Sequence, residues 1–282
     1  MKHYLSALLF SGMLTFSVAA QEFQMPAASP SVKIEQDFST SFIKLNYSRP
    51  SVKERKIFGD LIPYDEVWRT GANSTTQITF GEAVKVMGKE VKAGTYTLYT
   101  IPGEKEWVVI LNTDLDNWGA DGYNKRKNVV EAKIPVERLN KQQETFSFTV
   151  EDLTKNTANL TLAWADVKIN IPIEADNHKR IMAHLKRELA GENPPYHRAA
   201  GYYLETGEKL EDALKYIGEA IKENPEAYYM YWTEAQIYEK LGHSKMALRS
   251  AQKSADIARK TSPAFAHEYE RNLKEMSQRL NK

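Results

Sequence analysis

Two runs of alternating apolar residues decide the fold of the first half of this chain: TFSFTV at residues 145–150 and NLTLAWADVKINIPI at residues 159–173. In each run every second side chain is apolar, which is typical of a β-strand that buries one face. The residues between the runs are polar, with a turn near residues 155–157. The pattern therefore predicts an antiparallel β-hairpin.

The alternation changes phase inside the second run. Leu160, Leu162 and Trp164 share one face, but beyond Trp164 the apolar side chains stand at Val167 and at every second residue up to Ile173. One extra residue in a strand moves all later side chains to the opposite face unless the strand bulges there. We therefore predict a β-bulge, or a change of sheet, around residues 165–166.

The same period of two extends from residue 31 to residue 174 and is interrupted by Gly, Pro and Asn. Further strands are predicted at SFIKLNYS (41–48), TQITF (76–80), AVKVMG (83–88), GTYTLYTI (94–101) and EWVVILN (106–112). Many short strands without helical spacing between them indicate an all-β antiparallel domain over residues 31–174. The pattern fits a sandwich and a jelly roll equally.

Beyond Asp176 the apolar spacing becomes helical, so residues 177–281 are predicted to form an all-α domain. Small and aromatic residues recur there: Ala200, Tyr203 and Gly207 return 35 residues later as Ala235, Tyr238 and Gly242, and Ala213 and Ile217 return 34 residues later as Ala247 and Ala251. A period of about 34 residues is that of tetratricopeptide helix pairs. We predict two degenerate repeats of this kind, capped by helices near residues 177–189 and 262–280.

The first twenty residues have the pattern of a signal peptide. Lys2 provides a basic start, residues 4–18 are apolar but too few to span a bilayer, and Ala19-Ala20 resembles a cleavage site. We expect cleavage after Ala20, a linker at residues 21–30, and a periplasmic or secreted bacterial protein. The chain contains no cysteine, which excludes disulfides, thiolate metal sites and a lipid-modified cysteine. No other apolar run is long enough for a membrane helix, so we expect no membrane contact after signal removal.

The charge of the chain is nearly balanced, with a formal net charge of +1. Basic and acidic residues also balance within each half. Nucleic-acid binding relies on a basic surface that neutralises several phosphates. The sequence therefore disfavours nucleic acid, and by the same reasoning anionic lipid, as a partner.

The β half resembles a known family. Its stretches NYSRPSVKERKIFGDLIPYDEVWRTGAN, VKAGTYTLYTIPGEKEWVVILN and WGADGY are similar to the bacterial exported domain of unknown function numbered 2911, over residues 31–174. The matching motifs are Ser48-Arg49-Pro50, Phe58-Gly59, Pro63-Tyr64, Val67 to Asn73, Ala93 to Tyr96, Ile101-Pro102, Trp107 and Trp118-Gly119. Two positions depart from the family pattern: Glu54 stands where glycine is usual, and Ser74-Thr75 replaces an acidic residue and alanine. The resemblance implies export and frequent fusion to helical repeats, and it implies no established activity.

The β half contains no His and no Cys. The histidines beyond the signal peptide all lie in the helical half, at His178, His184, His197, His243 and His267. Without His and Cys, a catalytic triad, a Cys-His pair and an imidazole metal site are excluded from residues 31–174. Carboxylates remain, at Asp60, Asp65, Glu66, Asp114, Asp116 and Asp121. They leave open a carboxylate-dependent hydrolase that acts on glycans, with Trp107, Trp118 and Tyr123 as stacking platforms for sugar rings.

The stretch NTDLDNWGADG at residues 112–122 is rich in oxygen donors of the kind that bind calcium. It does not match an EF-hand, because Lys125 stands at the twelfth position counted from Asp114, where a glutamate is needed. Two hypotheses stay open for Asp114, Asp116 and Asp121: a looser calcium-binding loop, and a polar turn whose side chains bond local backbone amides. No other metal or cofactor is expected.

A candidate ligand site is predicted around VWRTGAN at residues 67–73. Arginine beside aromatic rings can bind a carboxylate, a sulfate, a phosphate or a sugar acid. The candidate residues are Arg49, Arg55, Tyr64, Trp68, Arg69, Asn73 and Trp118, and Arg49, Arg69 and Asn73 are expected to converge on one cavity. Gly71 is expected to let the backbone approach a ligand.

The structural alternative for these residues stays open. Arg49 or Arg69 would then pair with Asp60, Asp65 or Glu66, while Asn73 would close a turn and Trp68 would fill the core.

The favoured function is non-catalytic. We expect an exported β-sandwich that binds an anionic small molecule or a glycan, joined to helical repeats that contact a protein partner. The alternatives are the glycan hydrolase and a scaffold in which both halves contact only proteins.

Overall fold

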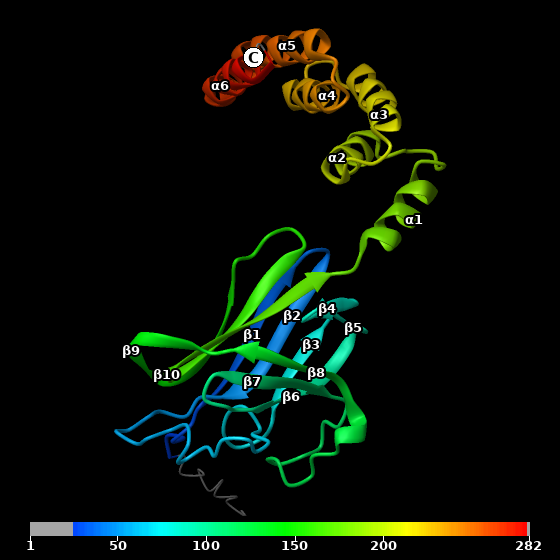
Figure 1. The fold of residues 1–282 in the computed structure, drawn as a ribbon. Coiled ribbons are helices and arrows are strands. Elements are labelled where there is room, and N and C mark those ends of the chain that lie inside the picture. Colours follow the sequence, from blue (N-terminus) through cyan, green and yellow to red (C-terminus); the bar gives the residue numbers. More distant parts are fainter. Residues whose placement is uncertain (1–24, 281–282) are drawn as a thin grey trace, which may run out of the picture. The chain divides into compact units, whose positions relative to one another are not determined.

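A computed structural model describes residues 25–280 of the chain. The chain divides between Asp176 and Asn177 into two compact units, the β unit and the helical unit (Figure 1). The predicted signal peptide and residues 21–24 of the predicted linker lie outside the described residues.

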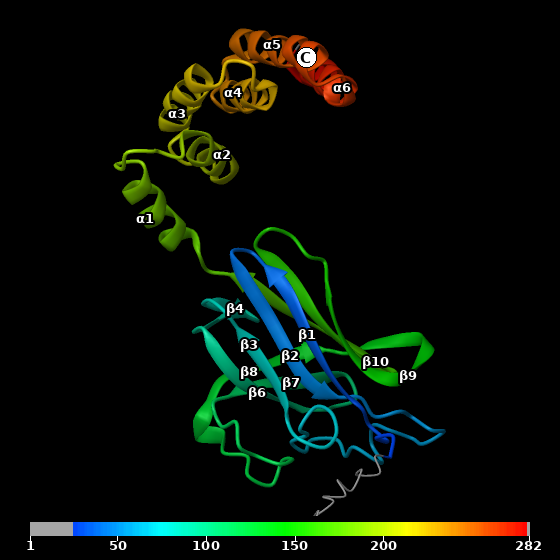
Figure 2. The same ribbon diagram turned by 180° about the vertical axis from the view of Figure 1, so that it is seen from behind.

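The β unit consists of two antiparallel sheets (Figures 1 and 2). The first has the order β1-β2-β3-β6-β7-β8, namely β1 (Ser31–Phe38), β2 (Ser41–Ser48), β3 (Thr76–Phe80), β6 (Gly94–Ile101), β7 (Glu106–Asn112) and β8 (Asn128–Pro135). The second has the order β5-β4-β10-β9, namely β5 (Lys89–Val91), β4 (Val84–Val86), β10 (Thr157–Ala175) and β9 (Glu137–Glu151). A short 3-10 helix, η1 (Lys125–Lys127), precedes β8. The predicted all-β antiparallel class is confirmed.

Strands that follow one another in the chain are also neighbours in the first sheet. The one interruption is the β4–β5 hairpin, which leaves between β3 and β6 to extend the second sheet. A jelly roll instead places strands alternately in its two sheets. The β unit is therefore a sandwich built from meanders.

The hairpin of β9 and β10 confirms the sequence prediction. Leu160 pairs with Val150 and Leu162 with Phe148, and the register then shifts on both sides of Ala165. Ala165 has a φ of 53°, in the left-handed region. This bulge restores the inward direction of the apolar side chains after Trp164, so β10 buries its apolar residues along its whole length.

Aromatic rings from both sheets and from the β2–β3 loop meet in the core. Trp68 of the loop stacks on Trp164 of β10, with ring centroids 5.8 Å apart and an interplanar angle of 18°. Phe58, Trp107 and Phe146 surround this pair in edge-to-face contacts. Such contacts contribute roughly 0.5–1.5 kcal/mol each beyond the burial of area. They fix the loop firmly on the end of the core.

The helical unit contains α1 (His178–Glu188), α2 (Tyr196–Thr206), α3 (Leu210–Glu223), α4 (Tyr228–Lys240), α5 (Ser244–Thr261) and α6 (Pro263–Leu280). Helices α2 and α3 pack together, as do α4 and α5, and α6 packs on α5 (Figure 1). The predicted all-α class of this half is confirmed. None of the helices between residues 178 and 280 combines the length and the apolar character that a bilayer crossing requires.

Equivalent positions of the two helix pairs have equivalent environments. Ala200 and Ala235 are buried, and so are Ala213 and Ala247. Gly207 and Gly242 follow α2 and α4 with φ values of 74° and 79°. A left-handed residue after a helix favours glycine, because any side chain is strained there. The recurrence in the sequence thus corresponds to a recurrence in structure.

Candidate functional site

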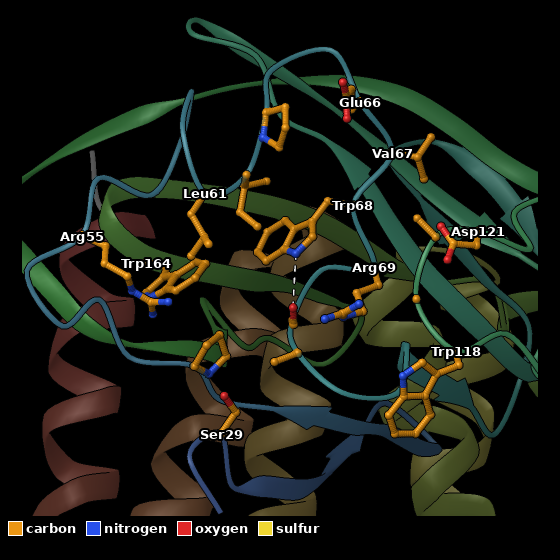
Figure 3. Close-up of a pocket in the computed structure, with 17 residues that line it drawn as sticks. Ser29, Arg55, Leu61, Glu66, Val67, Trp68, Arg69, Trp118, Asp121 and Trp164 are labelled. Atoms are coloured by element: carbon orange, nitrogen blue, oxygen red, sulfur yellow. Dashed lines mark hydrogen bonds between the residues drawn. The ribbon is translucent and has the colours of Figure 1, made fainter.

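A cavity of about 550 Å³ lies between two loops of the β unit (Figure 3). Most of its wall comes from the loop between β2 and β3, residues 49–75, which we call the arginine loop. The opposite wall is formed by residues 118–121, from the loop between β7 and β8, which we call the tryptophan loop (residues 113–124). Trp164 of β10 and Ser29, which precedes β1, complete the lining. Small-molecule sites have volumes of roughly 300–1,000 Å³, so the cavity has a suitable size.

Trp68 anchors the arginine loop to the sheet. Its backbone forms two hydrogen bonds with Thr100 of β6: Trp68 N donates to Thr100 O at 2.8 Å, and Thr100 N donates to Trp68 O at 3.0 Å. The indole Nε1 donates to Gly71 O at 3.2 Å, the bond drawn in Figure 3. Trp68 is therefore both a core residue and part of the cavity wall. The ligand-site hypothesis predicted the second role, and the structural alternative predicted the first.

Gly71 lines the cavity, and it also serves a close approach within the chain. Its φ is 152°, and a side-chain carbon there would lie 3.0 Å from Thr76 Oγ1 and 3.2 Å from Ser48 O. Thr76 Oγ1 itself donates to Thr70 O at 2.6 Å. The glycine lets the loop pass close to its own chain, and this contact explains the residue without a ligand.

Arg69 lines the cavity and has no acidic partner. Within residues 25–280 it forms no ion pair, and its Nε is buried without a hydrogen-bond acceptor. In Figure 3 its guanidinium lies between the indoles of Trp68 and Trp118. Buried polar groups in proteins are nearly always hydrogen-bonded, so an unpaired donor in a cavity wall requires an explanation.

The predicted pairing of Arg49 or Arg69 with Asp60, Asp65 or Glu66 is wrong. No ion pair joins either arginine to these carboxylates in the part of the chain that the structure describes. The physical reason for Arg49 is a nearer acceptor, because its Nε donates to Phe146 O on β9 at 3.0 Å.

The predicted convergence of Arg49, Arg69 and Asn73 on one cavity is also wrong. Arg49 and Asn73 are not among the lining residues. Asn73 has a φ of 58°, and its Nδ2 donates to Ser29 O at 3.0 Å and to Ser48 Oγ at 3.2 Å. Both side chains fasten the base of the arginine loop, and only Arg69 reaches the cavity.

Arg55 and Tyr64 differ from each other in placement. Arg55 lines the cavity, but its Nε donates to Val52 O at 2.9 Å and its Nη2 donates to Ser51 O. Two of its five N–H donors are thus used within the loop. Tyr64, predicted as a site residue, does not line the cavity, because its ring packs over Gly59, where a side-chain carbon would lie 2.6 Å from Tyr64 Cε2.

Trp118 stands at the mouth of the cavity with 73% of its surface exposed. Side-chain hydrogen bonds to backbone carbonyls hold its loop: Thr75 of the arginine loop to Asn117 at 3.2 Å, Gln77 of β3 to Leu115 at 3.3 Å and Thr97 of β6 to Asp114 at 2.6 Å. Thr75 is one of the two departures from the family pattern, and it fastens this loop. An exposed tryptophan on a fastened loop is thus presented to solvent in a fixed place.

Two of the oxygen-bearing side chains of residues 112–122, Asn112 and Asp114, have partners within the protein. Asp114 accepts from Lys127 Nζ at 2.7 Å, and this hydrogen bond lowers the pKa of the Asp114 carboxyl. Asn112 Oδ1 accepts from Asp114 N at 2.9 Å. Across residues 25–280, no three His, Cys, Asp or Glu side chains are grouped so that they could hold a metal ion. The calcium loop stays a prediction.

Trp164 is a cavity residue that was not predicted from the sequence. Only 1% of its surface is exposed, it lines the cavity, and its indole Nε1 has no hydrogen-bond partner among the described residues. An indole N–H is a donor only. Nothing in an alternating strand pattern distinguishes such a residue from an ordinary core tryptophan.

The arginine loop also concentrates unusual backbone conformations. Among residues 25–280, ten non-glycine residues have a positive φ, and five of them lie in this loop: Lys53, Glu54, Asp65, Thr70 and Asn73. Each such residue costs of order 1–3 kcal/mol and persists only where surrounding contacts determine it. The family's usual glycine at the position of Glu54 thereby has a structural reason, because Glu54 has a φ of 60°.

The fold and the cavity together define a β-sandwich with a small-molecule-sized cavity, followed by a helical unit. Residues 29–173 match the family described as "protein of unknown function (DUF2911)". The chain belongs to this family, as its motifs implied. The match ends before the helices, so their assignment as tetratricopeptide-like repeats stays a prediction. Comparison with curated proteins and with solved structures gave no match.

Proposed function

We propose that this protein is an exported, non-catalytic binding protein. Its β unit binds an anionic or polyhydroxylated small molecule or glycan in the cavity at Arg69. Its helical unit contacts a protein partner. The observation that carries the proposal is the guanidinium of Arg69, which lines a cavity without an ion pair in the described chain and with a buried, unpaired Nε.

The physical argument concerns desolvation. A charge that is partly removed from water costs free energy unless an opposite charge and hydrogen bonds compensate for it. Within residues 25–280 no carboxylate takes this role for Arg69, so an anionic ligand would supply both the charge and the acceptors. Trp164, another lining residue, also has an indole Nε1 without an acceptor in the described chain, as has Trp107 outside the lining.

A binding role accords with the residue types of the β unit. Residues 21–176 contain no His and no Cys, so a cysteine nucleophile and an imidazole base are missing from the chain's own β unit. The loops instead offer aromatic walls and arginine donors without acceptors. These features suit recognition of an anion better than bond cleavage.

The alternative is the carboxylate-dependent hydrolase acting on glycans. One observation favours it, namely that Glu66 and Asp121 both line the cavity. Glycosidases use two carboxylates on opposite sides of the scissile bond. Turnover of a glycan that Glu66→Gln and Asp121→Asn each abolish would establish this alternative and remove the non-catalytic proposal.

Export and the protein partner rest on sequence features. The basic and apolar start of the chain supports export, which fractionation of the producing bacterium tests by the position and the processed N-terminus of the protein. For the partner, the helical unit exposes aromatic surface at Tyr229 and Phe265. In-cell crosslinking with a photoreactive residue at Tyr229 tests this part, with an exposed position of α1 such as Lys179 as the control.

The binding proposal is tested by Arg69→Gln, which removes the charge and the forked donors but keeps part of the stem. Wild-type protein is screened by thermal shift with sulfate, acetate, citrate and neutral and acidic sugars. A bound compound at a hundredfold its Kd stabilises the protein by about 2.7 kcal/mol. We expect this gain to vanish in Arg69→Gln and to persist in Arg126→Gln, an exposed arginine outside the cavity lining.

Because Arg69 forms no ion pair among the described residues, Arg69→Gln should retain the stability of the wild type without ligand. If the variant keeps the ligand-induced gain in full, the cavity at Arg69 is not the binding site.

A further inference from the structure

The charges, aromatic rings and hydrogen-bond donors that line the cavity together restrict the chemical class of its ligand. We infer that its ligand is a hexuronic acid residue, free or at the end of a glycan, whose carboxylate pairs with Arg69 and whose ring stacks on Trp118. This inference rests on the proposed function and names the ligand class of the same site.

The charges favour a ligand with a single negative charge. Four of the described lining residues are charged, namely Arg55, Glu66, Arg69 and Asp121, and their formal charges cancel. Arg55 directs two of its nitrogens to backbone carbonyls, whereas Arg69 Nε is buried without an acceptor, so Arg69 has more donors to spare than Arg55. A dianion such as phosphate would bring two negative charges to a cavity that already holds two carboxylates, whereas a single carboxylate brings one.

Trp118 supplies a flat apolar surface beside this charge. It is among the exposed large apolar side chains of residues 25–280, and Leu61 of the facing loop is another. The apolar C–H face of a pyranose ring packs on an indole face, while the ring's hydroxyls point sideways. The hydrogen bonds from Thr75, Gln77 and Thr97 already order the loop, so little conformational entropy is lost on binding.

The remaining polar groups match hydroxyls. Glu66 and Asp121 are acceptors only, and sugar hydroxyls are donors that carboxylates bind well. Trp164 Nε1 is a buried donor without a partner in the described chain, and a hydroxyl or ring oxygen is an acceptor. A simple carboxylate would pair with Arg69 alone, whereas a sugar acid also brings hydroxyl donors for the carboxylates that line the cavity.

The experiment is isothermal titration of the mature full-length protein with five probes: sodium D-glucuronate, sodium D-galacturonate, D-glucose, sodium acetate and sodium sulfate. We expect at least one uronate to bind about tenfold or more tightly than glucose, acetate and sulfate, since ring and carboxylate contribute separately. Trigalacturonate separates the two sources, because a glycan end predicts tighter binding of the trimer and a free sugar acid does not.

Three variants assign the contacts. Arg69→Gln should weaken uronate binding about tenfold or more, and Trp118→Ala should weaken it about tenfold while Trp118→Phe retains most of it. Trp118 is exposed, so Trp118→Ala should melt at the wild-type temperature. Leu153→Ala, an exposed apolar residue of the β unit outside the cavity lining, is the control and should bind as the wild type does.

The outcomes separate this inference from the function on which it rests. Binding of acetate or sulfate that depends on Arg69, with no gain for either uronate, overturns the sugar-acid inference and leaves the binding proposal in place. Equal uronate affinity in Trp118→Ala and the wild type overturns the stacking contact and with it the inference. Uronate binding that is unchanged in Arg69→Gln overturns both.

Discussion

Gly119 lies close against the guanidinium of Arg69, so that a side-chain carbon at Gly119 would be only 3.2 Å from Arg69 Nη1. Gly119 also has a φ of 100°, which other residues rarely adopt. The backbone of the tryptophan loop therefore lies next to the guanidinium with no side chain between them. Both properties require glycine at this position, and the family motif Trp118-Gly119 has its physical reason here.

Gly119→Ala is expected to reduce stability and ligand binding together. The strained φ costs roughly 1–3 kcal/mol, and the added methyl group displaces the guanidinium. Urea denaturation and titration with the best ligand measure the two effects. Gly88→Ala is the matched control, because Gly88 also has a positive φ but has no atom within 4 Å of the added carbon. It should lose stability and keep its affinity, and equal affinities of both variants would contradict the contact with Arg69.

Glu54→Gly is expected to stabilise the β unit. Glu54 is exposed and has a φ of 60°, so glycine relieves a left-handed residue. That relief is worth about 1–2 kcal/mol, and the greater chain freedom of glycine offsets about 0.5–1 kcal/mol of it. A net gain of roughly 0.5–1 kcal/mol should appear in urea denaturation. Glu54→Ala keeps the strain and should show no gain, and a gain of equal size there would refute the role of the backbone.

Ala213→Leu and Ala247→Leu are expected to destabilise the helical unit. Both alanines are fully buried between paired helices, and overpacking such a site costs roughly 1–3 kcal/mol. Thermal unfolding followed by circular dichroism at 222 nm measures the loss. Ala264→Leu on α6 is an exposed control and should melt as the wild type does. Unchanged melting of both buried variants would rule out close helix approach at these positions.

The helical unit should lose stability in mild acid through His197. Burial lowers the pKa of His197, and the charge of Arg198 lowers it further; its ordinary value is 6.5. As the pH falls below about 6.5, the unfolded chain takes up the proton before the folded chain does, so folding becomes less favourable until the folded pKa is passed. His197→Gln should show a smaller fall in melting temperature between pH 7 and pH 5. An identical fall in both proteins would contradict this account.

Much of the β unit was predictable, because β2, β3, β6 and β7 are short alternating runs bounded by turns. The missed segments lack that signal. Residues 137–144 of β9 are almost all polar, and only their pairing with β10, such as Arg138 with Val167, makes them a strand. The strands β1 and β8 alternate weakly, and partners far along the chain hold them in place.

The candidate site was predictable in its residue types more than in its geometry. Arg55, Trp68, Arg69 and Trp118 do line one cavity. The acceptors that draw Arg49 and Asn73 away are backbone carbonyls of Phe146 and Ser29, which lie far from them in the chain. Backbone carbonyls belong to every residue, so no sequence motif marks which of them will be near.

Trp118 is far more exposed to solvent than the other tryptophans of the β unit, so the state of the cavity can be followed by tryptophan fluorescence. Trp68, Trp107 and Trp164 are 7%, 0% and 1% exposed, whereas Trp118 is 73% exposed. Emission from the β unit therefore combines a shielded population with one solvated indole at the cavity mouth. Iodide and acrylamide in solution reach that indole first, so the fraction of emission that they quench reports directly on whether the mouth is covered. Trp118 is thus an intrinsic fluorescent probe of ligand occupancy. Trp232, the single tryptophan of the helical unit, adds a background signal that Trp232→Phe removes.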